Sequence, residues 1–325
     1  MVIAYVYITR YSLGALDENT SEDKLTQIIS SLSQAIEDYK KSDNITVESP
    51  YDFIDYIGDN TTNALQDEIY QIVDNDFTKF SFLLAELEKI ITPYQIKYKD
   101  SSVIISSIQN QTLTFPRHYA FTQDKTYFWP QICRHFHTFS WRATLDQNSD
   151  FIAQNHNGSE EFISWSKQNY ENLEFHSDIE GTLHTVKQGR YEDYKAMFSH
   201  ALNTLNQSYY KISNASNQNE ADLIIIRDLT NSIGIKKHLA CSRQGANKPP
   251  PFKFPKSCSG AEVNCGQNHI PEYDEISCEY HLKIDTNDRD CSLPHLKKVR
   301  VYFGLKTYDH LTKKQIKVAH MGEHL

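Results

Sequence analysis

The chain has 325 residues, of which 39% are hydrophobic and 23% are charged. This composition is typical of folded globular proteins and excludes a disordered tail, and the length favours two domains. No run of 18 apolar residues occurs, which excludes an ordinary transmembrane helix. The first residues lack the basic segment of a secretory signal, so we expect a cytoplasmic protein with no membrane partner.

The charge is unevenly distributed along the chain. From Lys236 onward there are 15 Lys and Arg against 10 Asp and Glu, whereas the whole chain has 33 against 42. A basic end on an acidic body indicates a surface for nucleic acid or another polyanion, or one that docks on an acidic partner. Chance segregation of charge over solvated faces is the alternative.

The first third alternates predicted strands and helices. Residues 3–9 alternate as in a strand, and Ser21 caps a predicted helix whose apolar residues recur up to Tyr39. Further on we predict helices over 61–73 and 77–91, a hairpin of strands 94–99 and 103–106 with its turn at 99–101, and an extended segment over 112–121.

The middle of the chain is predicted to be mainly helical, with helices over 159–172, 191–205 and 220–235 and a polar linker over 213–219. Before them, residues 128–148 are rich in aromatic side chains. These interleave with Arg134, His135, His137 and Arg142. Such a stretch could bind a nucleotide, with rings stacked on the base and Arg on phosphate; an aromatic core with surface cations is the alternative.

Residues 244–271 are predicted to form a Pro-rich insertion, which is typical of a long irregular loop. Five of the six cysteines lie between 241 and 291, but no C-x-x-C pair signals structural zinc. A zinc site of Cys241, Cys258, Cys265 and His269 remains an alternative. Cys278 is expected to be a buried apolar residue.

Three strands follow. Residues 274–285 alternate most clearly, with Ile276, Cys278, Tyr280, Leu282 and Ile284 on one face. Residues 298–305 and 315–320 repeat the pattern, which predicts an antiparallel meander packed on a helix such as 220–235. The opposite face would then carry a polar set together: Glu279, His281, Lys283, Arg300, Tyr302 and Lys317.

This polar set has the chemistry of RNA cleavage without a metal. A Glu or His can act as base and as acid, and Lys and Arg can stabilise the charge on phosphorus. Residues 297–317 hold seven basic side chains against one acidic, which favours a phosphate backbone as partner. The candidate nucleic-acid contacts are Lys297, Lys298, Lys306, Lys313, Lys314 and Lys317.

Two other interpretations of the same strand stay open. Alternating charges are common on a solvated sheet face and contribute little to stability. Alternatively, Asp274 or Glu275 with Glu279 and Lys283 loosely matches a metal-dependent nuclease, in which two carboxylates hold Mg²⁺. The motifs of P-loop NTPases, Rossmann dehydrogenases and serine hydrolases are absent.

The run KVRVYFGLKTYDHLTKKQIKVAHMGEHL, residues 298–325, resembles the terminal hairpin of RelE-like toxin ribonucleases. Arg300 and Tyr302 match the first strand, and residues 317–324, with His320 and His324, match the final strand and basic tail. The resemblance covers about 30 residues, or 50 if the strand with EYHLK is included. It implies a small α+β fold with an antiparallel sheet and metal-independent RNA cleavage.

The sequence therefore predicts an α+β protein of two parts. Residues 1–212 would form an acidic, mainly helical body with short strands that senses or holds a partner. Residues 220–325 would form a basic domain that cleaves nucleic acid, RNA rather than DNA, in a toxin or defence role. No cofactor is expected. A non-catalytic subunit that binds nucleic acid or protein is the alternative. The candidate catalytic residues are Glu279, His281, Lys283, Arg300, Tyr302, His320 and His324.

Overall fold

The computed structural model describes residues 2–16, 19–58, 61–231, 239–245, 249–256, 273–289, 291–293, 298–308 and 311–325. The α+β class is confirmed. The chain forms two compact units, Met1–Leu145 and Asp146–Leu325. The division between these units lies after Leu145, whereas we predicted a boundary between 212 and 220, and residues 146–212 lie in the same unit as the basic C-terminal part.

The first unit is built on a parallel sheet in the order β3-β2-β1-β4-β5. In register, Ala4 lies beside Ile45 of β2 and Arg117 of β4. Strands of this kind need long crossovers, and helices supply them here. The strands are β1 (Ala4–Tyr7), β2 (Ile45–Pro50), β3 (Gln95–Ile96), β4 (Arg117–Phe121) and β5 (His137–Thr138).

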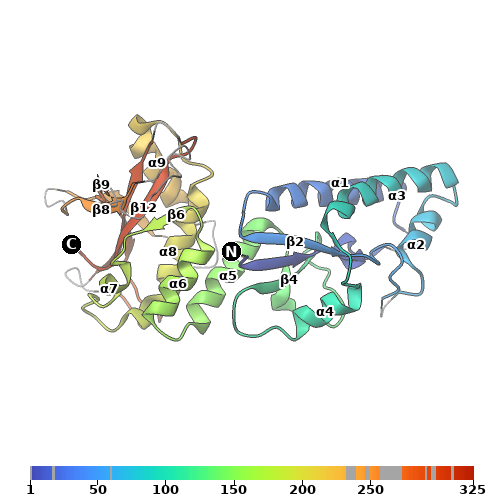
Figure 1. Cartoon of the computed structure of the whole chain (residues 1–325), viewed down its shortest axis with the longest axis horizontal. Coiled ribbons are helices and arrows are strands. Elements are labelled where there is room, and N and C mark those ends of the chain that lie inside the picture. Colours follow the sequence, from blue (N-terminus) through green and yellow to red (C-terminus); the bar gives the residue numbers. More distant parts are fainter. Residues whose placement is uncertain are drawn as a thin grey trace, which may run out of the picture. The chain divides into compact units, whose positions relative to one another are not determined.

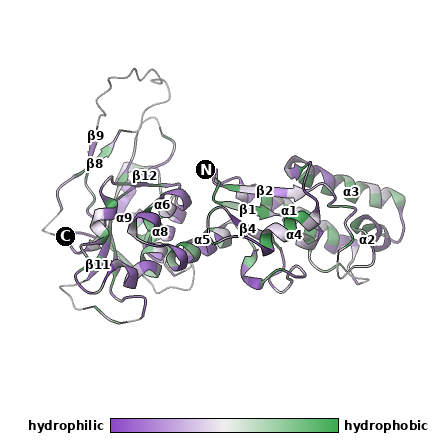
Figure 2. Cartoon of the chain, turned by 60° about the horizontal axis from the view of Figure 1, so that its bottom comes forward, coloured by the Kyte–Doolittle hydropathy of each residue, from purple (hydrophilic) through white to green (hydrophobic). Residues whose placement is uncertain are grey.

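Helices cover both faces of this sheet. Figure 1 shows α1 (Glu22–Tyr39) and α3 (Phe77–Ile91) on one face and α4 (Ser101–Gln109) on the other. Helix α1 is amphipathic, because its buried residues recur every three or four positions; α1 and α3 each mix hydrophobic and hydrophilic residues (Figure 2). The remaining elements are η1 (Arg10–Leu13), α2 (Leu65–Ile72), η2 (Thr92–Tyr94), η3 (Arg134–Phe136) and α5 (Trp141–Asn155), within which the unit boundary falls.

The hairpin predicted over 94–106 is wrong. Only Gln95 and Ile96 form a strand, and α4 begins at Ser101. The Asp100 carboxylate accepts a hydrogen bond from Val103 N at 2.8 Å, as an N-cap does. The residue assigned to a turn is therefore the cap of a helix, whose apolar residues Ile104, Ile105 and Ile108 are buried.

The second unit contains a sheet in the order β6-β12-β11-β10-β7. All its pairs are antiparallel except β12 with β6, so the predicted meander is confirmed with one strand added at each edge. The strands are β6 (Leu173–Phe175), β7 (Ala240–Arg243), β10 (Tyr280–Ile284), β11 (Val299–Lys306) and β12 (Gln315–Glu323). The helical elements are α6 (Ser159–Asn169), α7 (Ile179–Leu183), η4 (Tyr191–Tyr194), α8 (Lys195–Ser208), η5 (Ser216–Gln218) and α9 (Asn219–Leu229).

Helix α8 explains why residues 146–212 belong to this unit. It packs on β12 and α9, and every residue from Met197 to Ser208 is buried. Its polar side chains find partners within the unit: Asn203 and Gln207 donate to Asp146 at 2.6 and 3.0 Å. Hydrogen bonds of this kind allow polar side chains of a helix to be buried within the unit.

The strand predicted over 274–285 is interrupted. Residues 273–276 form β9, which pairs with β8 (Phe252–Pro255), and β10 begins only at Tyr280. The linking segment crosses β11 at Gly304, where an added Cβ would lie 2.8 Å from Ile276 and 3.0 Å from the Ser277 carbonyl. The close approach requires glycine, and it displaces Glu279 from the strand that carries His281.

Candidate functional site

The polar face of the second sheet brings together side chains from neighbouring strands. His281 lies opposite Tyr302, and Lys283 lies opposite Arg300, on β10 and β11. His281 also faces Ser242 of β7, and Tyr302 faces His320 of β12. Since alternate residues of a strand share one face, the pairing gathers the predicted imidazoles and cations on one side of the sheet.

A cavity of about 470 Å³ opens over this face. Three cationic side chains line it, together with two histidines, and its volume lies within the range of small-molecule and cofactor sites. The cleft, as we call it below, is lined by Ser242, Arg243, Gln244, Gly245, His281, Lys283, Arg300 and His324.

His281 lies at the floor of the cleft and is only 3% exposed. Its Nε2 lies 3.1 Å from Ser242 Oγ, while its Nδ1 has no hydrogen-bond partner among the described residues. Burial above all, together with the charges of Arg300 and Lys283, lowers the pKa of His281 to about 3. The imidazole is therefore neutral near pH 7.

Arg300 and Lys283 supply positive charge at the wall. Arg300 is 5% exposed and donates to Asp285 at 3.3 Å and to its own strand at Val299 O at 2.8 Å. Burial lowers the pKa of Arg300, although a guanidinium stays protonated at neutral pH. Within the described ranges Lys283 has no ion-pair partner, so its ammonium group is available to an anion.

Tyr302 lies beneath the cleft, between histidines. Its ring centroid is 5.1 Å from that of His281, 5.8 Å from that of His320 and 6.3 Å from that of His324. Its hydroxyl accepts a hydrogen bond from Leu325 N at 3.2 Å. Burial raises the pKa of Tyr302, so the phenol stays protonated and holds the segment that carries His324 against the sheet.

Besides Tyr302, two predicted catalytic residues, Glu279 and His320, lie outside the cleft lining. The Glu279 carboxylate is almost buried and forms an ion pair with Arg243 at 2.8 Å, so it orients that cation rather than facing the cavity as a base. His320 is buried, and its Nε2 lies 2.9 Å from Glu323 O. Its ring supports Tyr302 from the side away from His281.

Two predicted nucleic-acid contacts are structural instead. Lys314 is buried against Asp222 at 2.6 Å, and it also donates to Asn219 at 2.8 Å. The Lys317 ammonium group is buried in an ion pair with Glu174 and lies 5.6 Å from the ring centre of Phe254. Neither cation can reach a phosphate backbone, and the pattern of strand alternation alone could not show this.

The other predicted contacts remain at or near the surface. Lys298 pairs with Asp285 at 3.3 Å, and Lys306 lies over Tyr308 at 5.5 Å. Lys313 is partly exposed, and Lys297 lies outside the described residues. Lys298, Lys306 and Lys313 do not line the cleft, so they could only extend the positive electrostatic field around it.

The carboxylates of the metal-dependent alternative do not converge. Asp274 on β9 accepts a hydrogen bond from Tyr308 at 2.7 Å, Glu275 lies opposite Lys253, and Glu279 pairs with Arg243. No cluster of three metal-ligating side chains occurs in the parts of the chain that the structure describes.

The zinc alternative falls largely outside the described residues, because Cys258, Cys265 and His269 lie there. Burial raises the pKa of Cys241 to about 12, and it does the same for Cys278. Both thiols are therefore protonated at neutral pH and are poor nucleophiles.

Sequence reasoning missed the contribution of β7 to the cleft. This strand has four residues, ACSR, and supplies Ser242 and Arg243. It is too short to show alternation, and the sequence predicts no element over 240–243, directly before the insertion. The one available signal was the basic Arg243 just before the Pro-rich run.

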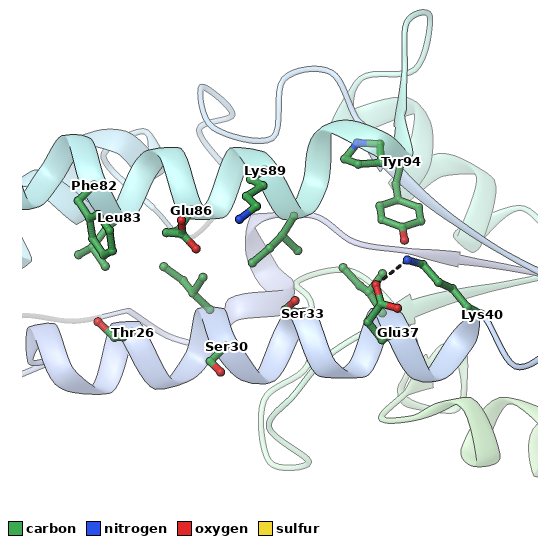
Figure 3. A pocket seen from close by; sticks show the side chains of 14 residues that line it. Thr26, Ser30, Ser33, Glu37, Lys40, Phe82, Leu83, Glu86, Lys89 and Tyr94 are labelled. Atoms are coloured by element: carbon green, nitrogen blue, oxygen red, sulfur yellow. Dashed lines mark hydrogen bonds and ion pairs between the residues drawn. The ribbon is translucent and has the colours of Figure 1, made fainter.

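A second large cavity, of about 530 Å³, lies between α1 and α3. Figure 3 shows Glu86 and Lys89 of α3 pointing toward α1, where Lys40 donates to Glu37 at 2.5 Å. The ion pair between Lys40 and Glu37 is exposed, and such pairs contribute little to stability. It has no convergent set comparable to that of the cleft.

Within the described ranges, no helix has both the length and the apolar character needed to cross a membrane. Comparisons of the chain with protein-family models, with curated proteins and with solved structures find no match.

Proposed function

We propose that the protein cleaves RNA in the cleft without a metal ion. The observation that carries the proposal is the convergence of Arg243, Lys283 and Arg300 with the imidazoles of His281 and His324 around one cavity. Cations in a half-enclosed cleft favour an anionic substrate, and guanidinium groups favour phosphate oxygens in particular.

RNA suits this set of groups better than DNA. Its 2′-hydroxyl is an internal nucleophile, which a positioned imidazole can activate. In the proposed step, the 2′-oxygen forms a bond to phosphorus while the bond from phosphorus to the 5′-oxygen breaks. The products are a 2′,3′-cyclic phosphate and a free 5′-hydroxyl, so no oxidant or external water is consumed.

The cleft residues take distinct roles in this step. His281 accepts the 2′-hydroxyl proton, and Ser242 Oγ, which lies 3.1 Å from its Nε2, orients the ring. His324, in its protonated form, donates a proton to the leaving 5′-oxygen. Arg300 and Lys283 stabilise the charge that develops on the phosphoryl oxygens.

The low pKa of His281 is consistent with its role as base. With the cleft empty, burial and, after it, the neighbouring cations oppose its protonation. A bound phosphate offsets their charge and so raises the pKa of His281 toward the range in which an imidazole is an effective base. By resemblance to RelE-like toxins, the activity would serve a toxin or defence role, which rests on analogy alone.

The test is cleavage of labelled RNA and DNA by the full chain, with and without EDTA, for the wild type, Lys283→Ala and His281→Gln. We expect EDTA-resistant cleavage of RNA, reduced about 100-fold or more in both variants. Lys211→Ala, a change at an exposed lysine of the same unit outside the cleft, is the matched control and should cleave normally.

Each contrary result has a definite meaning. Loss of cleavage with EDTA would overturn the metal-independent mechanism. Binding of RNA that weakens with salt and in Lys283→Ala, without cleavage, would replace it with the non-catalytic binding function. If Lys283→Ala and His281→Gln both cleaved RNA as fast as the wild type, this cleft would be excluded as the site.

A further inference from the structure

The first unit has a point where the direction of chain winding reverses. Strand β1 lies between β2, which follows it through α1, and β4, which is reached only after β3 and α4. In open parallel sheets the loops after two such neighbouring strands diverge to opposite faces. The crevice left at the carboxyl ends of the strands is the usual place for a ligand.

A cavity of about 280 Å³ occupies this position in the described part of the first unit. Arg10 and Tyr11 reach it from the loop after β1, and Tyr127 and Phe128 reach it from the segment after β4. Glu68 of α2 completes the polar side. The volume suits a molecule of one or two rings, smaller than most drug-sized ligands.

The side chains at the polar end of the cavity are held in place by hydrogen bonds and an ion pair. Arg10 is held by the backbone carbonyls of Tyr56 and Asn63 at 2.8 and 2.7 Å, and it forms an ion pair with Glu68 at 2.7 Å. The side chains of Arg10 and Glu68 are 4% and 17% exposed. Burial raises the pKa of Glu68 although Arg10 opposes the rise, as expected of a carboxylate at the edge of an enclosed space.

The other walls are aromatic. The Tyr11 hydroxyl lies so close to Gly58 that an added Cβ there would be 1.7 Å from it, so the backbone at Gly58 and the ring fit only without a side chain. Phe128 is fixed by Arg134, whose guanidinium lies 4.7 Å from its ring centre, and by the edge of His137. Rings fixed in this way form a rigid platform for a planar ligand.

The charge of the cavity decides the class of ligand. Arg10 is compensated by Glu68, so the lining carries no surplus positive charge for a phosphate, in contrast to the cleft of the second unit. We propose that this cavity binds a nucleoside, whose base packs against Tyr127 and Phe128 and whose hydroxyl or amino groups donate hydrogen bonds to Glu68.

Titration of the full chain with adenosine, guanosine, cytidine and uridine, followed by calorimetry and thermal unfolding, tests this proposal. We expect at least one nucleoside to bind saturably and to raise the Tm, and its 5′-monophosphate to bind more weakly. Glu68→Gln and Tyr127→Leu should each weaken binding, by about tenfold for Glu68→Gln, whereas Tyr127→Phe, which keeps the ring, should bind as the wild type does. Lys283→Ala, in the other unit, should leave the affinity unchanged.

Glu68→Gln and Tyr127→Leu are the two test variants. Tyr127→Phe is their control, because it keeps the ring that packs on the base and removes only a hydroxyl. Failure of all four nucleosides to bind at millimolar concentration overturns the proposal. So does tighter binding of the monophosphates, and so does an affinity that neither variant changes.

Discussion

Lys314 shows how burial changes the meaning of a single basic residue. It is paired with Asp222, and both side chains are fully buried. We expect Lys314→Ala to lower the free energy of unfolding by about 3–5 kcal/mol, because it leaves Asp222 as a buried charge without its counter-ion. Urea unfolding measures this. Lys313→Ala, a change at the partly exposed neighbour, should stay within about 0.5 kcal/mol of the wild type.

A small effect of Lys314→Ala on stability, combined with a large loss of RNA affinity, would contradict this structural role. A second check is the pair Lys314→Met with Asp222→Leu. Removing both charges together should cost less than removing either one, since apolar replacement of a whole buried pair is often tolerated.

The low pKa of His281 can be measured directly by NMR. Its pKa of about 3 means that its ring signals should not titrate between pH 7.5 and 5 in the free protein. Lys283→Ala removes one of the charges that lower this pKa, so the pKa should rise in that variant. Saturating inorganic phosphate should raise it as well. A midpoint near 6.5 in the unliganded wild type would contradict the described environment.

Among the elements, the interrupted strand at β9 and β10 depends on Gly304. A Cβ at this position would lie 2.8 Å from Ile276 Cγ2 and 3.1 Å from Cys278 Sγ. We expect Gly304→Ala to lower the free energy of unfolding by about 1–3 kcal/mol through overpacking. Denaturant unfolding is the measurement, with Gly245→Ala, where an added Cβ meets nothing within 4 Å, as the control. Equal stability of the two variants would refute the close crossing.

The elements that the sequence predicted correctly are those with a long regular pattern. Helix α3 and the core of the β10–β12 meander follow from periodicities of 3.6 and 2 that burial imposes on the chain. Short elements were missed, because β6 and β7 have three and four residues. The prediction for residues 94–106 was wrong for another reason. Asp100 can form a turn or cap a helix, and only tertiary packing decides between the two structures.

The sequence predicted one part of the candidate site, namely which side chains share a face of the sheet. Alternation placed His281, Lys283, Arg300 and Tyr302 on one face, as the strand register has them. It could not identify which cations are neutralised, because Lys317 is paired with Glu174 far away in the sequence. It predicted a strand at β1 and an extended segment at β4, but not the parallel sheet that contains them, whose strands β3 and β5 have two residues each.

For the whole molecule, buried histidines predict a loss of stability in mild acid. Burial lowers the pKa of each of these residues in the folded state: His118, His137, His156, His281 and His320. The unfolded chain therefore binds more protons than the folded chain below about pH 6.5, and stability falls as the pH falls.

We accordingly expect the urea midpoint to drop between pH 7 and pH 5, a window above the range in which most carboxylates titrate. His281→Gln removes one of the groups and should make the drop shallower than in the wild type. A midpoint that is constant or that rises on acidification would contradict the neutral, buried state of these histidines.

The pairing of β12 has a consequence for the order in which the chain acquires structure. This strand pairs with β11 and also with β6, so Ile316 lies beside Leu173. Every strand of the first sheet, by contrast, lies before residue 139. During synthesis the first unit can therefore fold as soon as its residues leave the ribosome. The second unit cannot complete its sheet until β12 emerges, although α6, β6 and α8 leave the ribosome earlier. In that interval α8 lacks the strand β12 on which it packs, so side chains that are buried in the folded unit are exposed. This makes the second unit the more dependent of the two on chaperones.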